Sequence, residues 1–247
     1  MDWINELKRE FFSDEDSITR YIKIRFAFAC DVFQTLQWGL EGESDNLTEP
    51  IVYCVKMSTK TIYIGQSLDS QRRIKDLPIG ESHHFAKSIP PELWEKIIVI
   101  RWSRILRTEE GGLDVINKVK EDLVNNDKEL REKSDDKKHK KALEYIGKSL
   151  EFRLQSDLMP LFNSFRKVSK DGTILVSDNL VPSKIIKQTL PYIDKYYPKI
   201  KEHFDLIDKH SEKDLTIRKI GYKSSENFGC AVFPNYIWEK NKGTYLS

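Results

Sequence analysis

The sequence of 247 residues contains little cysteine and no long apolar run. Its three cysteines, Cys30, Cys54 and Cys230, are odd in number and lie far apart, so they cannot form a disulfide framework or a four-ligand zinc site. No apolar stretch approaches the roughly 20 residues that a membrane helix needs, and the first ten residues lack the basic-then-apolar order of a secretory signal. We therefore expect a soluble, cytoplasmic protein with no membrane partner.

Basic charge is scarce at the beginning of the chain. Residues 1–49 carry 5 Lys and Arg against 11 Asp and Glu, whereas residues 50–107 and 164–247 each have a net charge of +5. The overall charge of +2 hides this gradient. A polyanionic partner such as a nucleic acid would meet the middle and the end of the chain rather than its start. Blocks of charge also occur on ordinary solvated faces, so this pattern alone does not choose between the two interpretations.

Hydrophobic spacing predicts the main elements. Residues 13–40 have the spacing of a long helix, which forms an acidic N-terminal arm followed by a polar linker. Two short β-branched and aromatic runs, at 51–55 and 61–64, predict a hairpin, and the continuous apolar run 96–102 predicts a strand covered on both faces. The remaining predicted elements are helices in 66–75 and 109–161 with an exposed charged turn at 133–141, a strand at 173–176, and a helix over 182–207 that is interrupted or kinked at Pro191.

The predicted hairpin carries two tyrosines, Tyr53 and Tyr63, ten positions apart. With an odd-numbered loop such as residues 57–59, the numbers of facing residues add up to 116, so the two tyrosines sit directly opposite each other and share one face. Gly65 follows at once and permits another group to approach the strand closely. Arg73 comes eight residues later, on the following helix.

These residues belong to a longer pattern. Its pieces are Val52-Tyr53, then Tyr63-Ile64-Gly65, then Arg73, then Glu151 on a predicted helix, with Pro160 and finally Asn163 twelve positions after Glu151. The pattern resembles the catalytic core of the GIY-YIG nucleases, a superfamily that includes excision-repair nucleases, homing endonucleases and some restriction enzymes. The resemblance covers roughly residues 50–165.

The resemblance implies a fold and an activity. The fold class is α+β, with a small mixed or antiparallel sheet flanked by helices, and the activity is metal-dependent hydrolysis of DNA phosphodiester bonds in restriction, phage defence or repair. We therefore expect an acidic helical region in residues 1–49, a GIY-YIG-like nuclease domain in 50–165, and a basic α+β accessory region in 166–247.

The resemblance also assigns roles to the site residues. Glu151 would hold one Mg²⁺ or Mn²⁺ ion, with water and phosphate as the other ligands. Arg73 would make a forked contact with a phosphate oxygen. Tyr53 would act as general base if positive charge lowered its pKa from about 10, Tyr63 would position water or phosphate, and Asn163 would support the site.

The sequence departs from the family pattern at two positions. Ile51 stands where the opening triplet has its first glycine, and Leu77 stands four positions after Arg73, where the family often has His or Tyr. A loop could return one of the two following histidines to the site. We place His84 there, and we count His83 with Arg72 and Lys75 as contacts to nucleic acid.

Two alternatives to a DNA nuclease stay open. One is a catalytically inactive module of the same fold that binds nucleic acid or protein, and the other is an RNA-cleaving toxin. The aromatic residues among the lysines of the last third suit nucleic-acid binding, or they form a small aromatic core. The acidic N-terminal helix would serve for dimerisation, giving a homodimer, or would pack on the catalytic domain.

Overall fold

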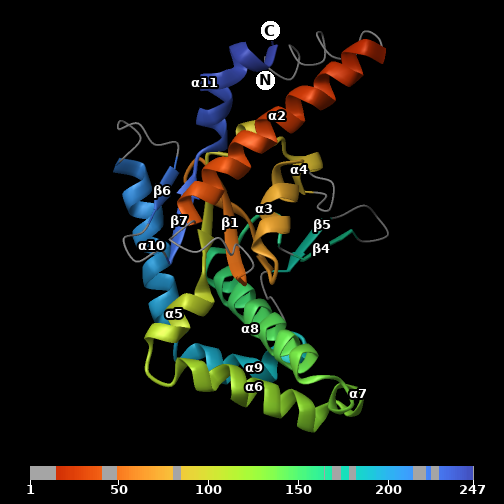
Figure 1. Ribbon diagram of the computed structural model, residues 1–247, viewed down its shortest axis with the longest axis vertical. Helices are drawn as coiled ribbons and strands as arrows, with labels where there is room; N and C mark the ends of the chain where they lie inside the picture. Colours follow the sequence, from red (N-terminus) through yellow and green to blue (C-terminus); the bar gives the residue numbers. More distant parts are fainter. Residues whose placement is uncertain are drawn as a thin grey trace.

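The centre of the molecule is a five-stranded antiparallel sheet with helices on both faces (Figure 1). The computed structural model describes residues 15–40, 49–79, 85–163, 165–168, 174–177, 182–213, 221–223 and 228–246. The strand order is β2-β1-β3-β7-β6, and the strands are β1 (Ile51–Met57), β2 (Lys60–Ser67), β3 (Lys96–Ile100), β6 (Gly221–Lys223) and β7 (Gly229–Val232). The expected α+β class, with a small antiparallel sheet flanked by helices, is confirmed at this level.

The middle strand β3 is buried at every position, as its continuous apolar run predicted. One of its neighbours is β1, from the predicted hairpin, and the other is β7, which comes from the last third of the chain. The sheet therefore takes strands from both sides of the expected boundary at residues 165 and 166. The division into three regions itself stays a prediction.

Alternation along the strands sends side chains into two apolar clusters, one on each face of the sheet. Tyr53 and Val55 of β1 belong to the first cluster, and Val52 and Cys54 belong to the second. The helices that contribute to the first cluster are α2 (Glu15–Leu40), α3 (Ser70–Ile79), α4 (Phe85–Ser88) and α11 (Pro234–Leu246).

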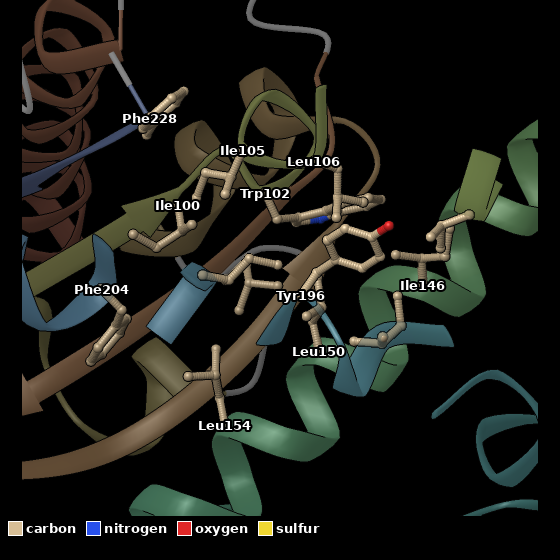
Figure 2. Packing of buried hydrophobic residues seen from close by; sticks show 14 of the residues in the cluster. Ile100, Trp102, Ile105, Leu106, Ile146, Leu150, Leu154, Tyr196, Phe204 and Phe228 are labelled. Carbon is tan, nitrogen blue, oxygen red and sulfur yellow. The ribbon is translucent and has the colours of Figure 1, made fainter. Parts of the chain in front are cut away.

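The second cluster is the larger one, and Figure 2 shows part of it, with Trp102, Leu150 and Tyr196 around its centre. Its helices are α5 (Trp102–Thr108), α6 (Gly112–Asn126), α8 (Asp135–Leu158), α9 (Lys184–Asp194) and α10 (Tyr197–Lys213), and the short helix α7 (Lys128–Arg131) adds Leu130. In Figure 1, α6, α8 and α9 gather below the sheet. α9 continues through Pro191, and the break between it and α10 falls at Lys195 and Tyr196.

The predicted hairpin is present, but its predicted register is wrong. Tyr53 pairs with Gly65 and Val55 pairs with Tyr63, and a bulge follows between Val55 and Lys56. The loop has two residues, Ser58 and Thr59, instead of three, and Ser58 has a positive φ of 53°. Positive φ suits a two-residue loop because it matches the twist of the two strands. The tyrosines are therefore diagonal neighbours, and the prediction that they share a face is confirmed.

A buried ion cluster fastens α10 to the ends of β1 and β3. The ammonium groups of Lys56 and Lys96 lie 2.5 and 2.7 Å from the two carboxylate oxygens of Asp208, and Lys96 also donates to the backbone carbonyl of Asp208 at 2.9 Å. Both lysines are almost fully buried. Their charges therefore depend on Asp208 for stabilisation.

Two short elements lie outside the central sheet. β4 (Phe165–Val168) and β5 (Ile174–Ser177) pair with each other in a separate antiparallel hairpin, which includes most of the strand predicted at 173–176. The other element is the 3-10 turn η1 (Pro91–Leu93), which leads into β3. None of the described helices has both the length and the apolarity needed to cross a membrane.

Candidate active site

The ring of Tyr53 lies directly over the backbone of Gly65. A Cβ atom added to Gly65 would come within 2.5 Å of the Tyr53 hydroxyl oxygen and 2.6 Å of its ring carbon Cζ. No side chain fits there, so glycine is required for steric reasons. The predicted close approach to Gly65 is confirmed, and the approaching group is Tyr53 itself, of which only 2% is exposed.

Tyr63 lies beside Tyr53 and extends it toward the surface. The ring centroids are 6.1 Å apart, and a hydrogen bond joins the two hydroxyl groups. On its other side Tyr63 stacks on Phe85 of α4, at 4.9 Å between centroids. The two tyrosine hydroxyls thus form one polar spot at the edge of an otherwise apolar cluster.

Asn163 docks on the free edge of β2 through its side-chain amide. Its Oδ1 accepts from the Ile64 backbone N–H at 2.6 Å, and its Nδ2 donates to the Ile64 carbonyl at 2.8 Å. One residue earlier, the Phe162 backbone N–H donates to the Ile62 carbonyl at 2.9 Å. The segment that follows α8 is therefore held against the strand that carries Tyr63 and Gly65.

Glu151 reaches the tyrosines from α8, which packs against β2. Ile146, Leu150 and Leu154 face the core, which leaves Glu151 on a neighbouring side of the helix. Its carboxylate accepts a hydrogen bond from Gln155 Nε2 at 2.9 Å. It lies close enough to Tyr63 for its negative charge to raise the pKa of that hydroxyl.

Burial raises the pKa of the Glu151 carboxyl to about 7. The hydrogen bond from Gln155 and the positive charges of Lys148 and Arg73 oppose this effect without cancelling it. Glu151 is therefore a carboxyl group whose ionisation falls near neutral pH. A group of this kind responds strongly to any cation placed beside it.

Arg73 brings positive charge to the same place from α3. Its charge lowers the pKa of Glu151 and of both tyrosines. Two of its donor nitrogens, Nε and Nη1, are buried and have no hydrogen-bond acceptor among the described residues. Buried guanidinium donors without acceptors are uncommon in proteins, and they indicate a place for an anion.

The tyrosine hydroxyls are protonated at neutral pH in this arrangement. Burial is the main cause that raises the pKa of Tyr53 well above its ordinary value, and neighbouring Tyr63 adds to it. Burial and the charge of Glu151 raise the pKa of Tyr63 to about 12. Arg73 acts in the opposite direction on both hydroxyls and does not outweigh these effects. The lowered pKa that Tyr53 would need as general base is not present here.

The structure thus brings together Tyr53, Tyr63, Arg73, Glu151 and Asn163. Arg72 and Lys75 lie on the exposed side of α3, where Arg72 is 3.9 Å from Asp69. His83 and His84 lie outside the described residues. Leu77 is fully buried in the first apolar cluster and does not take part in the site.

Sequence reasoning missed three residues around the site. Phe85 follows the two histidines in the sequence and stacks on Tyr63. Gln155 lies one helical turn after Glu151, and this four-residue spacing would have predicted that the two side chains are neighbours. Gln66 has a buried side-chain oxygen without a hydrogen-bond partner among the described residues, and this oxygen is 2.9 Å from an ideal Cβ on Gly147.

The donor set at the site is limited. Across the described part of the chain, no three His, Cys, Asp or Glu side chains gather in a way that could hold a metal ion. Glu151 is the carboxylate of the constellation. Mg²⁺ is commonly held by one or two carboxylates with several waters and substrate phosphates, and the residues present fit such a site.

The chain was compared with protein-family models, with curated proteins and with solved structures, and none of them matches it. The geometry of the site is therefore the basis on which a function can be assigned to the chain.

Proposed function

We propose that this protein is a phosphodiesterase of the GIY-YIG type that cleaves DNA with the help of one Mg²⁺ or Mn²⁺ ion. The observation that carries the proposal is Arg73, whose buried Nε and Nη1 have no described acceptor while its charge acts on Glu151 and on two tyrosines. A phosphate oxygen is the acceptor that a guanidinium fork fits best.

The residues around Arg73 suit hydrolysis of a phosphodiester. Water must be held in line with the phosphorus atom, and its oxygen must bond to phosphorus while the bond from phosphorus to one sugar oxygen breaks. The proton that the water gives up ends on that sugar oxygen, which leaves as a hydroxyl group. The linked hydroxyls of Tyr53 and Tyr63 keep their protons and orient this water or a phosphate oxygen. Arg73 stabilises the negative charge that grows on the phosphate.

Glu151 would hold the metal ion, with water and phosphate oxygens completing its ligands. The ion supplies charge neutralisation on the phosphate and a lower pKa for a bound water. Burial raises the pKa of Glu151 to about 7 and so disfavours the charged ligand at neutral pH, and a bound cation would lower this pKa again. Asn163 is a positioning residue that fixes β2 relative to α8.

The decisive experiment is cleavage of supercoiled plasmid by the purified protein with Mg²⁺ or Mn²⁺. We expect nicking or linearisation by the wild type, and a loss of at least about 100-fold in Arg73→Ala and Glu151→Gln. Arg153→Ala is the matched control, because Arg153 is also on α8 but pairs with Asp194 at the surface. Wild-type rates in folded Arg73→Ala and Glu151→Gln would overturn the proposal.

A second candidate function is nucleic-acid binding without cleavage. Leu77 favours it, because this position is buried and supplies no polar group to the site. Retention of DNA on the protein without any cut, over a panel of single- and double-stranded DNA and RNA, would support this candidate. Cleavage of RNA alone would identify an RNA-cleaving toxin.

A further inference from the structure

Three large apolar side chains are exposed within four residues of the segment that follows α8. The exposed fractions are 50% for Met159, 53% for Leu161 and 38% for Phe162. Pro160 between them is buried. No other four consecutive described residues expose three large apolar side chains. We call residues 159–162 the apolar wedge.

The backbone of the apolar wedge is fixed. Met159 ends α8 in the left-handed conformation, with φ of 43°, and its N–H donates to the Gln155 carbonyl at 2.9 Å. At the other end, Phe162 and Asn163 are hydrogen-bonded to β2. Exposed apolar groups on a firmly held backbone are suited to contact another molecule.

The apolar wedge is continuous with the candidate active site. The ring of Phe162 packs edge-on against Phe85 at 5.6 Å, and Phe85 stacks on Tyr63. Trp94 lies against the same Phe85 at 5.1 Å and supports it from within the core. A molecule that contacts Phe162 is therefore separated from the ring of Tyr63 by Phe85 alone.

We infer that the apolar wedge contacts an opened base step of duplex DNA beside the phosphate that is cut. This inference rests on the proposed function. Phe, Leu and Met are the side chains that proteins insert between base pairs to unstack and kink a duplex. Insertion next to the scissile phosphate would expose that phosphate to Arg73 and the tyrosines.

Charge supports DNA as the occupant. The wedge is followed after Asn163 by a basic stretch, with Arg166, Lys167 and Lys170 against Asp171. Arg166 and Lys167 belong to β4, which pairs with β5, and cations that follow the wedge this closely in the sequence suit the phosphates beside an opened step.

The test compares two duplexes of about 30 base pairs with the same sequence. One duplex is fully paired, and the other has a single unpaired 2-aminopurine at its centre, where the step is already open. Glu151→Gln serves as the background so that the DNA is bound and not cut. Fluorescence anisotropy measures the dissociation constant, and 2-aminopurine emission reports unstacking.

We expect the background protein to bind the open duplex roughly 10-fold more tightly or better, because that duplex does not have to be unstacked on binding. Its binding should also raise the 2-aminopurine emission. Adding Leu161→Ala and Phe162→Ala should bring the two dissociation constants within about twofold and remove the rise in emission. Leu161→Ala alone, which changes the most exposed side chain of the wedge, should reduce the preference without a risk to folding. Leu113→Ala on α6, with 56% exposure, is the control and should leave the preference unchanged.

Three outcomes would overturn the inference. A preference that survives in the double variant, or an equal affinity of the background protein for both duplexes, would show that the wedge does not contact an opened step. If the double variant bound both duplexes more weakly by the same factor, the wedge would make a general contact with DNA and not a contact with an opened step. In each of these cases plasmid cleavage by the wild type would still support the nuclease. Failure to bind either duplex and failure to cut plasmid would remove both proposals.

Discussion

The side-chain amide of Asn163 forms two hydrogen bonds with the backbone of Ile64, one as acceptor and one as donor. It thereby replaces the strand partner that the edge of β2 otherwise lacks at this position. The contact ties the end of α8, which carries Glu151, to the strand that carries Tyr63. Without this contact, the distance between the Glu151 carboxylate and the Tyr63 hydroxyl would be less firmly fixed.

Asn163→Asp removes one of these two bonds at constant size. The carboxylate cannot donate to the Ile64 carbonyl, so a polar pair is left unmatched, and we expect a loss of about 1–3 kcal/mol in the free energy of unfolding. Urea denaturation measures it. Asn235→Asp is the control, because the Asn235 side-chain oxygen accepts from the backbone N–H of its neighbour Tyr236, and an aspartate oxygen can accept the same bond. If both substitutions lowered the free energy of unfolding by the same amount, the two hydrogen bonds between Asn163 and Ile64 would not have the stabilising role described here.

Gly65→Ala should displace the Tyr53 ring, because the new methyl group would overlap it. Overpacking of this kind costs about 1–3 kcal/mol, and cleavage should fall with it. Gly147→Ala is the matched control. There the added methyl group would meet only the movable end of the Gln66 side chain, and the helix gains about 1 kcal/mol from replacing glycine. Thermal denaturation and plasmid cleavage of both variants check the prediction.

Asp208→Asn should destabilise the protein by about 3–5 kcal/mol, because Lys56 and Lys96 would lose their buried counter-charge. Asp205, one turn away, is itself exposed and pairs with Lys201, so Asp205→Asn should cost at most about 1 kcal/mol. Guanidinium denaturation at neutral pH compares them. Equal effects of the two substitutions would argue against a stabilising role of the ion cluster.

The same cluster predicts how stability falls in acid. Burial alone would raise the pKa of Asp208, but the hydrogen bonds and charges of Lys56 and Lys96 hold it below its ordinary value of 3.8. A carboxylate with a lowered pKa stabilises the folded state above its unfolded pKa, and this contribution is lost as the pH falls through the folded pKa. The wild type should therefore lose stability below pH 3.8 more steeply than Asp208→Asn.

Glu151 has the opposite pH dependence. Its folded pKa of about 7 lies above the ordinary value of 4.5, so its contribution to stability is full below pH 4.5 and is lost as the pH rises to about 7. In the presence of a chelator, Glu151→Gln should match the wild type at pH 4.5 and exceed it by up to about 3 kcal/mol at pH 8. Urea denaturation at the two pH values measures the difference. If the wild type and Glu151→Gln differed in stability by the same amount at both pH values, Glu151 would not be buried as described.

The sequence predicted the parts of the site that depend on local pattern. Two β-branched runs around a tight turn predicted the hairpin, and Gly65 predicted a close approach that Tyr53 makes. The register was missed by two residues. The two-residue loop shifts the pairing by one residue. The bulge after Val55 shifts it by one more, and a bulge depends on packing as well as on sequence. Phe85 was missed because its contact with Tyr63 depends on how α4 packs against the face of the sheet that carries Tyr63.

The fold was predicted less completely toward the end of the chain. β7 is a run of four small and apolar residues, and its place beside β3 depends on a pairing across most of the sequence. No local period indicates such a partner. α2 was predicted from its apolar stripe, and its described part runs from Glu15 to Leu40. Long amphipathic helices are the easiest elements to predict, and short buried strands are the hardest.

The pairing of Ile97 with Val232 determines when the molecule can be completed during its synthesis. β1, β2 and β3 leave the ribosome early, but the second edge of β3 has no partner until β7 has emerged. An apolar strand with an open edge readily pairs with another chain, and nascent chains spend seconds in such states at ordinary rates of translation. A premature stop codon before residue 229 would make this state permanent. Polysomes that translate this message therefore carry the aggregation-prone form of the protein, and the released chain does not.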